Sequence, residues 1–258
     1  KKREDYFVKS FSTIAELNQW ASIAKREDVA SYILSQLKNR VESKDLSRGP
    51  GHLELELYNL PPIDLYKAVF GSYSKACSNI NIKPLFYKNI TNDFFEDDAS
   101  MSEVEVVVDT REQKPLDFVN PKVMKLDFGD YTTTGENYTK TFVDRKSESD
   151  FKSTMSTGLD RFTKELERAR QFNSYLYIVT ESSIEKIKRN NNYSSHKSKL
   201  DYIWHNMRVL SHDFADTCQF IFAGDRNASK KIILKLLTSG DKLWNTDVQY
   251  FIDKQNEL

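Results

Sequence analysis

A β-hairpin is the strongest structural signal in the chain, and it lies in the segment GDYTTTGENYTKTFVDRKSESD. Residues 131–134 and 138–143 are rich in tyrosine, threonine and valine, which favour strands. The Gly-Glu-Asn sequence between them is typical of a turn. A hairpin centred on Asn137 would pair Asp130 with Asp144, because each lies seven residues from the centre. Directly opposed residues of antiparallel strands have Cβ atoms about 5 Å apart, so this hairpin would hold two carboxylates together.

This arrangement predicts a metal site with a lysine beside it. Side chains alternate along a strand, so Lys146 shares a face with Asp144 while Arg145 points to the other face. Two carboxylates this close repel each other, and one would tend to hold a proton unless a cation lay between them. Carboxylate oxygens suit Mg2+ or Mn2+, which can also bind a substrate phosphate. We therefore expect Mg2+ or Mn2+ at Asp130 and Asp144.

A buried strand is predicted upstream, over residues 104–108, and it ends in the charged sequence Asp109-Thr110-Arg111-Glu112. Strands that deliver charged residues at their ends are common at the sites of α/β folds. Four motifs, VVVDTRE, LDFGDY, VDRKSESDF and GLDRFTKELERAR, follow one another in this order. Together they resemble the XPF-type nuclease domain, which belongs to the PD-(D/E)XK superfamily. The resemblance covers roughly residues 103–240.

The resemblance implies roles for individual residues. Three acids would bind the metal, namely Asp109, Asp130 and Asp144. Lys146 would be the catalytic lysine. Glu112 would contact the active-site residues without binding the metal itself. The whole set that the resemblance implies for the active site is Asp109, Arg111, Asp130, Asp144, Arg145, Lys146 and Asp150. Asp144 departs from the family pattern, which usually has glutamate there, but the shorter carboxylate still allows metal binding.

Some of these residues also fit other roles. Asp150 lies three residues after Ser147, a spacing that caps a helix. Arg145, on the opposite strand face from Lys146, could simply pair with an acid. Arg161 matches a family arginine that approaches DNA, and it equally fits the exposed face of a helix over residues 159–172.

A basic patch is a further candidate for DNA contact. It surrounds an expected asparagine-rich loop, residues 190–192, and the neighbouring Tyr193. Lysines near an aromatic ring suit contact with the DNA backbone and base stacking, although a solvated loop would have the same composition. The cations of this patch are Lys186, Lys188, Arg189, Lys197 and Lys199.

The segment FGSYSKACSNINIK is the other candidate for DNA contact. Two short helices joined at Gly71 are compatible with a helix-turn-helix. The segment also resembles a DNA-binding repeat associated with homing endonucleases, and a plain helical scaffold is the alternative. Contact with DNA would involve Ser72, Tyr73, Ser74 and Lys75.

The pattern of apolar residues divides the chain into three parts. Residues 1–91 predict a smaller, mostly helical domain, with helices beginning after Ser12 or Thr13 and near Asp28. Residues 92–102 are acidic and predict an interdomain linker. Residues 103–258 alternate strands with helices, which predicts an α/β fold. Its central mixed β-sheet would be flanked by helices in the restriction-endonuclease-like arrangement.

Composition excludes few functions. The net charge is zero, so overall charge does not point to a nucleic-acid partner. The two cysteines are far apart and predict neither a metal site nor a disulfide framework. No signal peptide or apolar run of membrane length is apparent. We therefore expect an intracellular protein of the cytoplasm or nucleoid with no membrane partner.

The resemblance implies a Mg2+-dependent endonuclease that cuts branched, flap or otherwise structured DNA in repair or recombination. It also implies a homodimer formed through the nuclease domain. Many relatives carry a helix-hairpin-helix module after the nuclease, and this chain has no evident match to it after residue 240. That difference favours an alternative, a sequence-directed, homing-type endonuclease. A catalytically silent DNA-binding partner is a second alternative, although such family members typically lose the metal-binding acids.

Overall fold

The computed structural model describes residues 10–90, 104–119 and 121–256. Contacts divide the chain into two compact units, Lys1–Tyr87 and Lys88–Leu258. The expected acidic linker, residues 92–102, lies outside the described residues. Among the described helices, none is long and apolar enough to cross a membrane.

The first unit is mostly helical, as expected. Thr13 accepts a hydrogen bond at the start of its first helix, as expected, and Ser72 does so at the start of its last. Tyr66, Ile33 and Leu37 are fully buried, and the Tyr66 hydroxyl donates to the Ile33 carbonyl at 3.1 Å. The elements are α1 (Ile14–Ile23), α2 (Arg26–Lys44), β1 (Arg48–Gly49), α3 (His52–Leu57), α4 (Ile63–Phe70), α5 (Tyr73–Ser78) and β2 (Lys83–Pro84).

The second unit is built on a mixed six-stranded sheet with the order β4-β3-β5-β6-β7-β8. β5 is antiparallel to both of its neighbours, and the other pairs are parallel. The predicted α/β fold with a central mixed sheet is therefore confirmed. The strands are β3 (Val106–Asp109), β4 (Lys122–Met124), β5 (Tyr131–Thr133), β6 (Thr141–Lys146), β7 (Tyr175–Thr180) and β8 (Cys218–Phe222).

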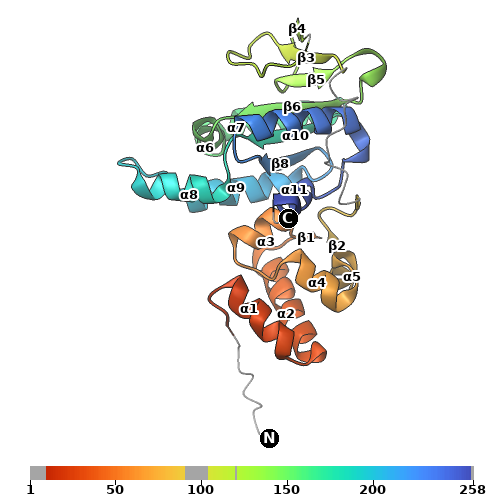
Figure 1. Ribbon diagram of the computed structural model, residues 1–258, viewed down its shortest axis with the longest axis vertical. Helices are drawn as coiled ribbons and strands as arrows, with labels where there is room; N and C mark the ends of the chain where they lie inside the picture. Colours follow the sequence, from red (N-terminus) through yellow and green to blue (C-terminus); the bar gives the residue numbers. More distant parts are fainter. Residues whose placement is uncertain (1–9, 91–103, 120, 257–258) are drawn as a thin grey trace, which may run out of the picture. The chain divides into compact units, whose positions relative to one another are not determined.

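Helices flank this sheet on both faces (Figure 1). The helices are α6 (Glu148–Thr154), α7 (Leu159–Gln171), α8 (Ile184–Tyr193), α9 (Leu200–Asp213), α10 (Arg226–Ser239) and α11 (Val248–Asn256), with short 3-10 turns at Gly135–Asn137 and Gly240–Lys242.

The central strands are buried on both faces. Tyr177 and Val179 of β7 join Val143 of β6 in a core that includes Ile233 of α10 and Val248 of α11. The intervening side chains point to the other face, because strand residues alternate. There, rings from the helices α6, α7 and α9 pack against β8, in the pairs Phe151–Phe220, Phe162–Phe220 and Trp204–Phe222.

The hairpin pairs in the predicted register, because Tyr131 of β5 lies opposite Val143 of β6. One residue further, the regular ladder stops. The Asp130 amide donates to the Val143 carbonyl at 2.8 Å, and the Arg145 amide donates to Asp130 Oδ2 at 2.7 Å. The Asp130 side chain thus replaces a backbone acceptor at the end of the hairpin.

Two local predictions were wrong. The second hairpin strand begins at Thr141 rather than Tyr138, because Lys140 has a left-handed backbone with φ of 57°. The asparagine-rich segment forms the last turn of α8 instead of a loop. Asparagine is a poor helix former, but the Asn191 side chain accepts from the Ser198 amide at 2.8 Å and fastens this end.

Several elements were not predicted, among them α3, β4 and α11. β4 lies at the sheet edge, and its three residues are exposed, so no apolar alternation marks it. α11 is held partly by polar contacts, since Gln249 Oε1 accepts from the Phe222 amide at 2.8 Å. Such contacts leave no periodic apolar signal in a sequence.

Gly129 is required at the start of the hairpin. Its φ is +67°, and a Cβ there would lie 3.1 Å from both the Val143 carbonyl oxygen and Leu176 Cδ1. We expect Gly129→Ala to lower the free energy of unfolding by about 2–4 kcal/mol, from left-handed strain and overpacking together. Gly135→Ala is the matched control, because Gly135 has φ of +63° and nothing within 4 Å of the added Cβ. Chemical denaturation giving equal losses for both variants would contradict this account.

Candidate active site

Four functional side chains predicted from the sequence gather where β3, β5 and β6 meet. Asp109 ends β3, Asp130 precedes β5, and Asp144 and Lys146 lie near the end of β6. The Asp130 backbone joins the strands, because its carbonyl accepts from the Asp109 amide at 2.8 Å and its amide donates to Val143. The sheet register therefore brings together residues from three separate sequence motifs.

Lys146 is paired with Asp144 in a largely buried position. Its Nζ lies 2.7 Å from Asp144 Oδ2 and 2.9 Å from Oδ1. Side-chain exposure is 13% for the lysine and 8% for the aspartate. The same Nζ lies 5.4 Å from the centre of the Phe162 ring of α7, so an apolar wall of the site limits its movement.

The acids outnumber the cations at this point. Burial raises the pKa of Asp130 above its usual range, and the nearby Asp144 carboxylate raises it further. Burial acts against the charge on Lys146, but Asp144 and then Asp130 act in its favour, and the net result is a raised pKa for the lysine. The carboxylates therefore favour positive charge between them.

Glu165 is a further acid of this cluster that the sequence reasoning missed. It lies on α7, and its Oε1 accepts from the Gly129 amide at 2.9 Å. Burial raises the pKa of Glu165, and Asp144 adds to the increase. The helical pattern predicted only the buried stripe of Phe162 and Leu166. No spacing signal indicates that the neighbouring glutamate faces the hairpin, because that depends on how α7 packs.

Asp109 lies in a different environment, because protein donors surround its carboxylate. Oδ1 accepts from the Arg111 amide at 2.8 Å and from Arg111 Nε at 2.6 Å, and Oδ2 accepts from the Leu126 amide at 2.6 Å. Burial alone would raise the pKa of Asp109, but these bonds lower it. The Arg111 side chain itself is 62% exposed.

Arg145 points away from the acids, as the strand alternation predicts, and enters a buried ion-pair network. Its Nη2 donates to Glu112 Oε1 at 3.0 Å, and its Nη1 lies 2.9 Å from Glu181 Oε1. The same Nη2 also donates to the Lys114 carbonyl at 3.1 Å. Arg226 shares Glu181 at 2.9 Å and binds the Lys114 carbonyl as well. Arg145 therefore clamps the segment after β3 against the ends of β6 and β7.

Asp150 is exposed and takes part in a helix cap. The Asp150 amide donates to Ser147 Oγ at 3.2 Å, and the hydroxyl donates to Asp150 Oδ2 at 2.6 Å. This is the capping arrangement that the Ser147–Asp150 spacing allows, and its carboxylate is engaged there.

Comparison with known proteins identifies the family. The protein-family model described as the ERCC4 domain matches residues 108–251, which is more than half of the chain. The chain belongs to the ERCC4 domain family. No match was found among curated proteins.

Two solved structures are similar to part of the chain. XPF from Aeropyrum pernix has 20% identity and a TM-score of 0.40, over 52% of this chain and 64% of that one. XPF from Aeropyrum pernix in complex with DNA has 19% identity and a TM-score of 0.38, over 53% of this chain and 64% of that one. The chain thus spans less than two thirds of the length of the solved chains that it matches.

Two of the predicted DNA-contact regions lie in the ERCC4 domain. Arg161 is exposed on α7, one turn before Glu165 and therefore on a similar side of the helix. α8 follows β7, whose last residue Thr180 pairs with Lys146. Its Asn190 donates to Glu148 of α6 at 2.8 Å. The cationic helix therefore begins at the edge of the sheet that carries the acids, with Lys186, Lys188, Arg189, Lys197 and Lys199 on it or just beyond it.

The N-terminal candidates are placed in the first unit. α4 ends at Gly71 with a left-handed backbone, and Ser72 caps α5. Lys75 is exposed and Ser74 is partly exposed, but the Tyr73 ring is buried and its hydroxyl donates to the Pro50 carbonyl at 2.7 Å. The ring of Tyr73 is therefore part of the core and is not presented for stacking on DNA.

Removing Arg145 should destabilise the ERCC4 domain severely. Arg145→Ala leaves the buried Glu112 carboxylate without its cation and Glu181 with Arg226 alone, so we expect a loss of about 3–5 kcal/mol in the free energy of unfolding. Arg226→Ala is the comparison, because Arg226 is 43% exposed and Glu181 would keep Arg145. We expect a loss nearer 1 kcal/mol there. If chemical denaturation gave equal and small losses in the free energy of unfolding for both variants, Arg145 would not hold these segments together.

Asp130→Asn should raise stability in metal-free buffer, with a defined pH dependence. A carboxyl whose pKa is raised in the folded state contributes fully to the free energy of unfolding below its unfolded-state pKa. That contribution to stability is lost as the pH rises towards the folded-state pKa. The stability advantage of the variant over the wild type should therefore grow upwards from about pH 4. Asparagine keeps an oxygen to accept from the Arg145 amide.

The control is Asp127→Asn, an exposed position three residues earlier, which should show no such growth. Thermal melts in chelator across the pH range would measure both differences. A wild type that gains stability over Asp130→Asn with rising pH would contradict the raised pKa.

Proposed function

We propose that this chain is a divalent-metal-dependent DNA endonuclease that hydrolyses phosphodiester bonds. The observation that carries the proposal is the pair of neighbouring, largely desolvated carboxylates, Asp130 and Asp144, with Lys146 beside them. Membership of the ERCC4 domain family supports the same reaction class. Each of the three residues comes from a motif that the sequence resemblance had assigned to catalysis.

The donor set suits a hard divalent cation. Asp130 and Asp144 offer carboxylate oxygens, which Mg2+ and Mn2+ prefer. Burial, and then the neighbouring Asp144 carboxylate, raise the pKa of Asp130, so a bound divalent cation would favour its ionised form. Glu165 is a third carboxylate within electrostatic reach of Asp144. Asp109 would take part only by exchanging bonds that it now makes to Arg111 and Leu126, and its role as a ligand stays a prediction.

A divalent cation at this place would polarise the phosphoryl oxygen and lower the pKa of a bound water. The protein residues supply the rest. Asp130 and Asp144 would hold the cation, with Asp130 oriented by the Arg145 amide. Lys146, kept charged by Asp144, would face the negative charge that develops on phosphorus. Arg111, with its exposed guanidinium, would lie beside the substrate phosphate.

The substrate we propose is branched, flap or otherwise structured DNA in repair or recombination. The basic patch of α8 and Arg161 would extend contact along the phosphate backbone. The helical first unit, in which α4 and α5 joined at Gly71 are compatible with a helix-turn-helix, would bind DNA through Ser72 and Lys75. A homodimer formed through the ERCC4 domain is part of the same proposal.

Cleavage should depend on metal and on the acids. Purified protein with Mg2+ or Mn2+ should cut flap or forked DNA, and chelation should stop it. Asp130→Asn, Asp144→Asn and Lys146→Met should each lower the rate by about 100-fold or more, because even residues behind metal ligands typically contribute 10- to 100-fold. DNA binding in chelator should persist for Asp130→Asn.

Glu167→Gln is the control, since Glu167 is exposed on α7 and lies away from the cluster. Random-sequence duplex, flap and forked substrates should be compared side by side. Cutting only at one long duplex sequence would identify a homing-type enzyme instead. Absence of metal-dependent cleavage on every form would favour a silent DNA-binding partner.

A further inference from the structure

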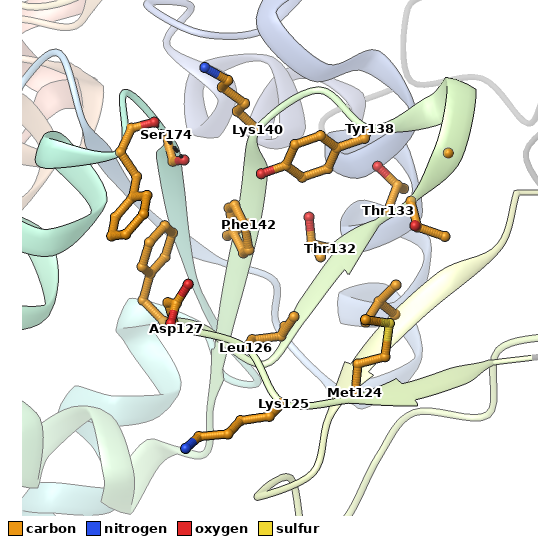
Figure 2. A pocket seen from close by; sticks show the side chains of 15 residues that line it. Met124, Lys125, Leu126, Asp127, Thr132, Thr133, Tyr138, Lys140, Phe142 and Ser174 are labelled. Atoms are coloured by element: carbon orange, nitrogen blue, oxygen red, sulfur yellow. Dashed lines mark hydrogen bonds between the residues drawn. The ribbon is translucent and has the colours of Figure 1, made fainter.

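A cavity lies beside the cluster of acids, on the same face of the sheet. It has a volume of about 490 Å³, which is within the usual range for small-molecule sites. Its floor includes Val107 of β3, Thr132 of β5 and Phe142 of β6. These side chains alternate with the core residues Val108 and Tyr131, so they point away from α10. Figure 2 shows Phe142 and Thr132 at the centre of the lining.

Aromatic rings form much of the cavity wall. Phe128 and Phe142 are buried, with ring centres 4.4 Å apart. Two outer rings are exposed, Phe172 by 55% and Tyr138 by 47%. Phe172 lies 6.0 Å from Phe128, and Tyr138 lies 6.3 Å from Phe142 in an edge-on arrangement. The outer rings thus leave aromatic surface available to a flat apolar ligand.

The lining also has polar side chains, among them two lysines and Asp127. Lys140 and Lys125 lie at opposite ends of the group in Figure 2, with the Tyr138 ring nearer Lys140. Aromatic surface between two ammonium groups suits a ligand with a planar ring and an anionic backbone. A nucleotide has both, because every base presents a π-face and every phosphate is negative.

The cavity adjoins the proposed catalytic centre through three short connections. Phe142 precedes Asp144 by two residues on the same strand face, a separation of about 7 Å. Phe128 likewise precedes Asp130 by two residues. Leu126, also in the lining, donates its amide to Asp109. The distance of about 7 Å is about twice the axial spacing of about 3.4 Å between phosphates along one strand of a duplex, so a nucleotide next to a phosphate at the acids would reach the cavity.

We propose that this cavity binds one unpaired nucleobase of the substrate strand, beside the phosphate that is cut. The inference rests on the proposed nuclease function and adds a substrate feature to it. A base within a duplex is stacked and paired, so only an unpaired or extruded base would enter. The cavity would therefore select DNA with a single-stranded nucleotide at this position.

The test combines protein variants with DNA that lacks one base. Phe172→Ala and Tyr138→Ala remove exposed rings, so the fold should persist, which thermal melting checks. Tyr202→Ala is the matched control, because Tyr202 is 49% exposed on α9, away from the cavity lining. Forked DNA is prepared with a single abasic nucleotide at each position around the cut. Each protein is measured for binding in chelator and for cleavage with Mg2+.

One abasic position should weaken binding to the wild type by roughly 5- to 150-fold, the range of base–aromatic stacking. Phe172→Ala should show a similar loss on intact DNA and little further loss on that abasic DNA. Tyr202→Ala should behave as the wild type on both. A fluorescent 2-aminopurine at the sensitive position should be quenched by the wild type and less by Phe172→Ala.

Several results would overturn the proposal. An absence of any sensitive abasic position would do so, and so would equal losses for Phe172→Ala on intact and abasic DNA. Metal-dependent cleavage with either result would leave the nuclease function standing without the base site. Base-dependent binding without cleavage would leave the site standing and reject the nuclease function. Loss of both would reject both.

Discussion

The pairing of β5 with β6 determines most of what this domain presents at its surface. With Tyr131 opposite Val143, the two apolar side chains enter the core beneath α10. The next residue, Asp130, then leaves the regular ladder and bonds across to both neighbouring strands. A shift by one residue would turn every side chain of the hairpin to the opposite face. The core would lose its apolar residues and the acid cluster would lose its members together.

The opposite faces of β6 serve different purposes. The side chains of Asp144 and Lys146 lie on the face that carries the acid cluster, whereas those of Val143 and Arg145 point to the other face. Arg145 is held between Glu112 and Glu181, which ties the segment after β3 to the ends of two strands. The clamp and the acid cluster therefore depend on the same backbone. Arg145 influences the site through its amide, which donates to Asp130, as well as through its guanidinium.

The cavity and the acids share a boundary made of one segment, residues 125–130. On one side, Phe128 joins the aromatic wall, and on the other, the amides of Leu126 and Gly129 hold Asp109 and Glu165. A ligand that moved this segment would change the hydrogen bonding of both acids.

Local pattern in the sequence was enough to predict the mixed α/β sheet, most of the helices and the Tyr131–Val143 register. These features depend on alternation, turn residues and caps within a few positions of one another, which a sequence displays directly. The motifs also indicated the family, which the ERCC4 match confirms. Polar contacts between distant residues were not visible in this way, so α11 and the helical end of α8 were missed.

Only the tertiary structure decided which side chains meet. Glu165 approaches Gly129 because α7 packs against β7, and nothing in the helix sequence specifies that neighbour. Asp109 turned out to be surrounded by donors from Arg111 and the more distant Leu126, and Tyr73 to be buried with its hydroxyl bonded to Pro50. The sequence by itself determined the strands, their alternation and the residue types available for chemistry. Packing decided their neighbours and charge environment, because burial and electrostatic coupling depend on distances in space rather than in sequence.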